Sequence, residues 1–113
     1  MEDTRITFET AKLAKEKGFI IKTKYSWYVP DNSKPIIEKH KPDGLYYLSC
    51  PTQSLLAKWL REKHNIHLIA YKNINIDGYD WCYITTDGIT NINSYKTYEE
   101  ALEAGLYQAL LLL

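Results

Sequence analysis

The chain has 113 residues, the size of one domain, so we expect a single domain over residues 1–113 whose core needs no disulfide or metal. It has 14 basic and 14 acidic residues, and this net charge of zero disfavours nucleic-acid binding. Two cysteines make no disulfide scaffold, the first residues lack a signal-peptide core, and no apolar run is long enough to span a membrane. The sequence therefore predicts a cytoplasmic globular protein.

A helix and a strand are predicted first. Residues 8–17 (FETAKLAKEK) are good helix formers, with Thr7 as a plausible N-cap and Gly18 just past the last turn. Residues 19–29 alternate aromatic or β-branched side chains with mostly polar ones, which indicates a strand.

A loop and a second strand follow. Residues 30–44 hold three of the four prolines and predict a loop, with a short extended piece at Ile36 and Ile37. A loop of this length is either mobile or functional. Residues 45–49 predict a strand paired with the first.

The second half begins with a helix from Pro51, placed in the first turn, to Asn65, which can take the left-handed conformation that closes a helix. Its core face is built from Leu, Trp and Leu at helical spacing. Strands are expected at 66–71 and 81–85, joined through the turn pair Asp77-Gly78. A further turn at Asp87-Gly88 leads into a polar connection through Ser94.

The last helix starts with a capping box, in which Thr97 is the N-cap and Glu100 the N3 residue. The cap and the helix dipole account for the acidic pair Glu99-Glu100. Gly105, on the apolar face, indicates close approach of another element. The order α-β-β-α-β-β-α predicts the α+β class, with a small antiparallel sheet of about four strands and three helices packed on one face.

Three segments resemble a family of short uncharacterised proteins from bacteriophages and prophages of Bacteroidetes-type bacteria. They are the helix over Phe8–Phe19 that ends in Lys-Gly-Phe, the Pro-Thr-led helix over Pro51–Glu62 with Trp-Leu-Arg-Glu, and the Tyr-Glu-Glu-Ala-Leu segment over Tyr98–Leu102. The resemblance covers about two-thirds of the chain and skips residues 30–44. It implies a phage accessory protein in the host cytoplasm, and it transfers no catalytic residue.

Histidine and cysteine supply two candidate sites. His64 and His67 could share a metal on a continuous helix, but Asn65 interrupts it, so we expect the rings to diverge and no metal site. Cys50 precedes a helix start, where a thiol pKa can fall, yet no base is placed beside it. A small half-buried residue is the favoured interpretation of Cys50, and a small enzyme that uses this thiol is the alternative.

Aromatic residues on the first predicted strand pair supply the candidate ligand site. Aromatic rings beside lysines can stack a base and hold a phosphate. The candidate ligand-binding residues are Tyr25, Trp27, Tyr46, Tyr47 and Lys39. The competing interpretation, which we favour, is one packed and one solvent-facing side of an antiparallel pair.

The function predicted from these residues is non-enzymatic, with no catalytic residue and no cofactor. The protein would bind a host protein or a small, nucleotide-like ligand, and in a phage setting it would counter host defence. Single-stranded nucleic-acid binding by the aromatic hairpin is a further alternative. Leu111 and Leu112 point away from the apolar stripe of the last helix, which predicts a homo-oligomer formed through that helix.

Overall fold

The computed structural model describes residues 4–30, 34–39, 47–75, 77–85 and 88–113. They form three helices and six strands. The helices are α1 (Phe8–Glu16), α2 (Gln53–His64) and α3 (Tyr98–Leu111). The strands are β1 (Tyr25–Tyr28), β2 (Ile36–Lys39), β3 (Tyr47–Ser49), β4 (His67–Asn73), β5 (Gly78–Thr85) and β6 (Gly88–Tyr95).

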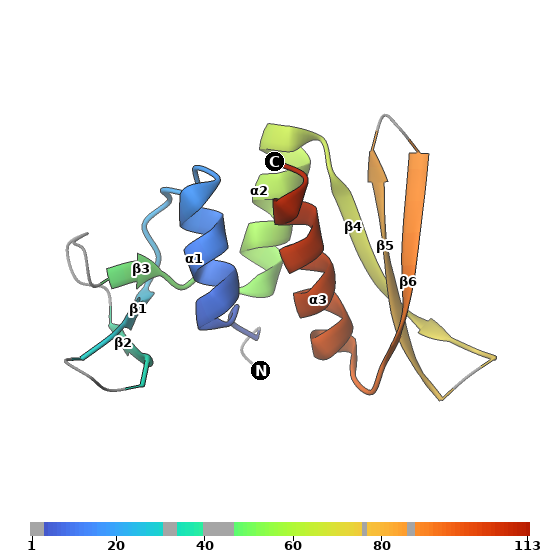
Figure 1. Cartoon of the computed structure of the whole chain (residues 1–113), viewed down its shortest axis with the longest axis horizontal. Coiled ribbons are helices and arrows are strands. Elements are labelled where there is room, and N and C mark those ends of the chain that lie inside the picture. Colours follow the sequence, from blue (N-terminus) through green and yellow to red (C-terminus); the bar gives the residue numbers. More distant parts are fainter. Residues whose placement is uncertain (1–3, 31–33, 40–46, 76, 86–87) are drawn as a thin grey trace.

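The strands form two antiparallel three-stranded sheets, in the orders β2-β1-β3 and β4-β5-β6. The three helices lie between the two sheets, with α1 towards the first sheet and α3 against the second (Figure 1). The α+β class and the three helices are confirmed. The expectation was one sheet of about four strands. The described residues instead form six strands, because β2 and β6 were not expected, and these strands divide between two sheets.

All three helices begin with a threonine cap. The hydroxyl oxygens of Thr7, Thr52 and Thr97 each accept a hydrogen bond from the backbone N–H three residues on. The expected caps at Thr7 and Thr97 are thus confirmed, whereas Pro51 lies before the cap of α2 rather than in its first turn. Asn65 ends α2 with φ 54°, the left-handed conformation expected of it.

The apolar core lies between the helices and draws most heavily on α3. Leu102, Leu106, Ala109 and Leu110 of α3 are buried in one cluster with Leu56, Trp59 and Leu60 of α2. Gly105 faces the second sheet, where a Cβ would lie 2.7 Å from Leu68 Cδ1 and 3.2 Å from the Trp81 ring. The expected close approach at Gly105 is confirmed.

The predicted strand 19–29 is wrong over its first half, since only Tyr25–Tyr28 joins a sheet. Side chains instead hold the backbone of the preceding segment. The Thr23 hydroxyl donates to Tyr25 O at 2.6 Å and accepts from Cys50 N at 3.0 Å, and Ser49 Oγ donates to Ile21 O at 2.9 Å. These bonds replace the ladder that a strand would make.

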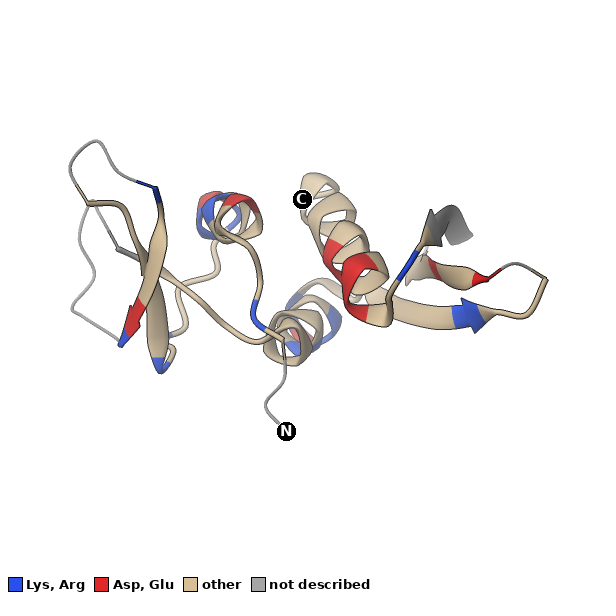
Figure 2. Cartoon of the chain, turned by 90° about the horizontal axis from the view of Figure 1, so that it is seen from below, with Lys and Arg blue, Asp and Glu red and all other residues tan. Residues whose placement is uncertain are grey.

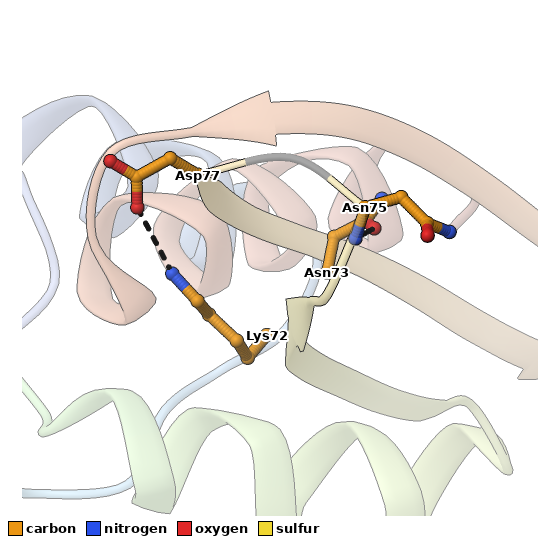
Figure 3. Close-up of polar contacts among 4 residues, drawn as sticks. All are labelled: Lys72, Asn73, Asn75 and Asp77. Atoms are coloured by element: carbon orange, nitrogen blue, oxygen red, sulfur yellow. Dashed lines mark hydrogen bonds and ion pairs between the residues drawn. The ribbon is translucent and has the colours of Figure 1, made fainter.

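The predicted polar connection after Gly88 is also wrong, because residues 88–95 form β6 and pair antiparallel with β5. The preceding hairpin is confirmed, but Gly78 is already the first residue of β5, opposite Asn73. Lys72 Nζ lies 3.4 Å from Asp77 Oδ1, and Asn73 Oδ1 accepts from Asn75 N at 2.9 Å (Figure 3). These contacts close the β4–β5 turn.

Candidate functional site: an acidic groove between α1 and α3

The predicted aromatic site is partly assembled by the first sheet. Tyr25 of β1 lies directly opposite Lys39 of β2, and the exposed Lys39 side chain is free of the core. The Arg5 guanidinium lies over the Tyr25 ring at 4.4 Å, and Lys24 Nζ lies 5.5 Å from the same ring. The aromatic–cation adjacency expected here is therefore present at Tyr25, with Arg5 as an unforeseen partner.

Trp27 has a different role from the one proposed for it. Its Nε1–H donates to Ile6 O at 3.0 Å, and its ring meets Phe8 edge-on at 5.9 Å, so the indole packs against the core. Tyr47 pairs through its backbone with Tyr28, one position along from Trp27. Tyr46 lies outside the described residues. The structure thus brings Tyr25 and Lys39 together but not the full predicted set.

Cys50 sits at a buried corner between β3 and α2. Its Sγ lies 3.9 Å from Ile6 O, and its carbonyl accepts from Arg5 Nη1 at 2.7 Å. Burial raises the pKa of the Cys50 thiol from 9.0 to about 11, despite the opposing effect of nearby Arg5. At neutral pH the thiol is therefore protonated, which does not favour a nucleophilic role.

The two histidines make separate contacts. The His64 ring meets Trp59 edge-on at 4.7 Å, while His67 Nε2 lies 3.1 Å from Asn65 Oδ1. α2 ends at His64, so His67 lies on the following strand and the two rings point to different partners. Over the part of the chain that the structure describes, no group of three His, Cys, Asp or Glu side chains is placed to hold a metal ion.

An open groove of about 470 Å³ lies between α1 and α3. Its α3 wall is a stripe at helical spacing that faces away from the core. The lining residues are Thr7, Glu9 and Thr10 of the α1 side, Tyr95 at the end of β6, and Glu100, Glu103, Ala104, Tyr107 and Gln108 of α3. This lining combines three carboxylates and two tyrosines with no basic side chain.

Glu103 lines the groove and joins α3 to the starts of α1 and α2. Its Oε2 accepts from Thr7 N and from the Thr7 hydroxyl, both at 3.0 Å, and its Oε1 accepts from Gln53 Nε2 at 3.0 Å. The carboxylate thus lies at the N-terminus of α1, where the helix dipole favours negative charge. Because both oxygens of its carboxylate already accept hydrogen bonds from the protein, Glu103 serves to hold the helices together.

Glu9 and Glu100 are different, because no ion pair or side-chain hydrogen bond engages either carboxylate among the described residues. Both side chains are exposed, on the first turns of α1 and α3. Figure 2 shows the acidic residues gathered in the first half of α3. The groove therefore presents uncompensated negative charge beside the rings of Tyr95 and Tyr107.

The sequence did not reveal this groove. At the level of sequence a capping box accounts for Glu100, and nothing there shows that Glu9, some ninety positions earlier, lies across from it. One local pattern could have marked it: Glu100, Ala104, Tyr107 and Gln108 repeat at helical spacing on the face opposite the leucine stripe.

Comparison of the chain with protein-family models, curated proteins and solved structures gave no match. The resemblance to phage and prophage proteins therefore stays a prediction. No helix of the described chain has the length and apolar character needed to cross a membrane. The case for a function rests on the residues themselves.

Proposed function

We propose that the protein is a non-enzymatic binding protein whose α1–α3 groove takes a cationic group of its ligand. The single observation that carries this proposal is the pairing, in one groove, of the unpartnered carboxylates Glu9 and Glu100 with the rings of Tyr95 and Tyr107. A cation gains from a carboxylate by a charge-assisted hydrogen bond and from a tyrosine face by cation–π attraction. The groove volume is that of a small-ligand site.

A basic segment of a partner protein suits this groove better than a nucleotide does. Phosphates would be repelled by Glu9 and Glu100, whereas a lysine or arginine side chain could bury its stem against Ala104 and Tyr107. A host protein as the partner, a role in phage biology and a cytoplasmic location remain part of this proposal. They are supported by the sequence resemblance and composition alone.

A titration of the ¹⁵N-labelled protein with an arginine-rich peptide, followed by NMR, tests the proposal. We expect saturable shifts around Thr7, Glu100 and Gln108, and none with a glutamate-rich peptide of equal length. Replacing both free carboxylates, in Glu9→Gln/Glu100→Gln, should weaken binding at least about tenfold, since each lost charge-assisted contact is worth about 1 kcal/mol or more.

The matched control is Glu16→Gln/Glu99→Gln, which changes the net charge equally on the same two helices but outside the groove lining. Its affinity should stay within about twofold of the wild type, as expected for charges that act only at long range. Equal weakening by the two double variants would reduce the effect to overall charge and contradict the proposed site.

A further inference from the structure

A second surface of the protein carries exposed aliphatic side chains. Ile20 is 80% exposed and Ile21 39%, in the segment that leaves α1, and Leu111 and Leu112 are each about half exposed at the end of α3. The three helices lie side by side and run in the same direction, so that their last turns lie on one side of the molecule (Figure 1). We call this surface the helix-end surface; it lies away from the helix starts that hold Glu9 and Glu100.

Basic residues lie next to the isoleucines in the chain and in the last turn of α2. Lys17 and Lys22 flank the two isoleucines, and the last turn of α2 holds Arg61 and Lys63. The nearby acidic residues are Glu16 and Glu62, and Glu62 Oε1 is 3.8 Å from Lys58 Nζ. Cations in a last helical turn favour the helix dipole. Lys22 lies beyond α1 and has no such role, so capping does not explain the whole basic rim.

We propose that the helix-end surface docks on a membrane surface that contains anionic phospholipids. Ile20 and Leu112 would enter the interfacial layer while Lys17, Lys22 and Lys63 meet lipid phosphates. Protruding aliphatic side chains with a basic surround are the features that favour peripheral attachment to such a surface. Ile20 stands out from the protein, whereas Ile21 lines a hollow of about 210 Å³ beside Trp59 and Lys63 of α2.

Two other occupants fit these residues less well. A single-stranded nucleic acid would stack its bases on exposed aromatic faces, and this surface presents isoleucine and leucine instead. A two-fold contact between copies would set the same surface against itself, bringing Lys17 and Lys22 near their counterparts. Like charges opposed across an interface disfavour association. Charge complementarity therefore favours an anionic surface.

Cosedimentation with unilamellar vesicles tests this inference on the whole chain. We expect binding to phosphatidylcholine vesicles with about 30% phosphatidylglycerol, little binding to phosphatidylcholine alone, and release at about 0.5 M salt. The Ile20→Ser/Leu112→Ser variant lacks apolar insertion, and the Lys17→Gln/Lys22→Gln variant lacks part of the attraction to anionic lipids. Each should therefore bind at least about fivefold more weakly.

Matched controls lie elsewhere on the protein. Ile74→Ser removes an even more exposed isoleucine, 92% exposed in the β4–β5 turn, and Lys34→Gln/Lys96→Gln removes two exposed lysines, one before β2 and one before α3. Both should bind vesicles like the wild type, and circular dichroism should show every variant folded. Absent or equal binding to the two vesicle types, or equal losses in the controls, overturns the proposal. So does a lipid-free oligomer that Ile20→Ser/Leu112→Ser dissociates, because a second copy then occupies the surface.

Discussion

Trp27 illustrates how one side chain can satisfy a binding pattern and yet belong to the core. Its indole N–H is bonded to Ile6 O and its ring packs on Phe8. We predict that Trp27→Ala lowers the free energy of unfolding by about 2–4 kcal/mol, because a large packed ring and a hydrogen bond are lost together.

Urea unfolding measures this loss. Trp27→Phe should cost roughly 1 kcal/mol, mainly for the hydrogen bond. Ile37→Ala, directly opposite on β2 and exposed, should stay within about 0.5 kcal/mol of the wild type. If Trp27→Ala leaves the stability unchanged, the indole does not contribute to the core, and Trp27 is again a candidate contact for a ligand at the surface.

The buried Cys50 thiol gives a pH dependence whose sign follows from its raised pKa. Below pH 9 the thiol is protonated in both the folded and the unfolded chain. Between its ordinary pKa of 9.0 and its folded value of about 11, the unfolded chain loses the proton and the folded chain retains it. Folding stability should therefore fall as pH rises through this window, by about 2 kcal/mol at most.

The comparison that isolates this effect is with Cys50→Ala, which lacks the ionisable group but keeps every tyrosine and lysine. Unfolding free energies measured from pH 8 to about pH 10.5 should fall more steeply for the wild type than for the variant. Parallel curves for the two proteins would show that Cys50 ionises equally in both states.

At the level of elements, the contact between α3 and the second sheet depends on Gly105. Alanine is normally the better helix former by about 1 kcal/mol, yet here its Cβ would press on Leu68 and the Trp81 ring. We predict that Gly105→Ala destabilises the protein by about 1–3 kcal/mol, as overpacking does. Thermal unfolding measures it, and Leu68→Ala combined with Gly105→Ala should cost less than the sum of the two single changes. If the costs of the two single changes simply add, the strain does not arise from contact between the new Cβ and Leu68.

The helices were predictable because their determinants are local in sequence. Thr7, Thr97 and Asn65 mark helix ends through bonds and dihedral angles a few residues away, and the leucine spacing marks the buried face. β6 was missed because its residues are mostly polar, and its strand conformation comes from pairing with β5. Strand formation of this kind depends on partners that a sequence window does not contain.

The two candidate sites also differ in how far apart in the sequence their residues lie. Tyr25 and Lys39 of the predicted site lie opposite each other because both belong to one sheet formed by neighbouring segments. The α1–α3 groove joins residues from the first ten positions to residues beyond position 94, so only helix packing reveals it. Packing also decided that Trp27 faces inward and that Cys50 is buried, which alternation of residue types alone left open.

For the whole molecule, the sequence predicts self-association through α3, and this stays a prediction. Leu111 and Leu112 are about half exposed, which is the condition that the prediction requires. If a second copy covers these leucines, in place of the membrane surface proposed above, Leu111→Lys/Leu112→Lys should lower the mass measured by light scattering while circular dichroism stays unchanged. A wild type that is monomeric at high concentration would refute it.

The two sheets are attached to the helices very differently, and this governs how the folded protein fluctuates. α3 packs along the second sheet, whereas the first sheet is held through α1 and the Trp27 contacts with Ile6 and Phe8. Local opening is cheapest where few buried contacts are broken. In native-state hydrogen exchange, the amides of β1 should therefore exchange well before those of β5, and the first sheet should open as a cooperative unit while α3 and the second sheet stay closed.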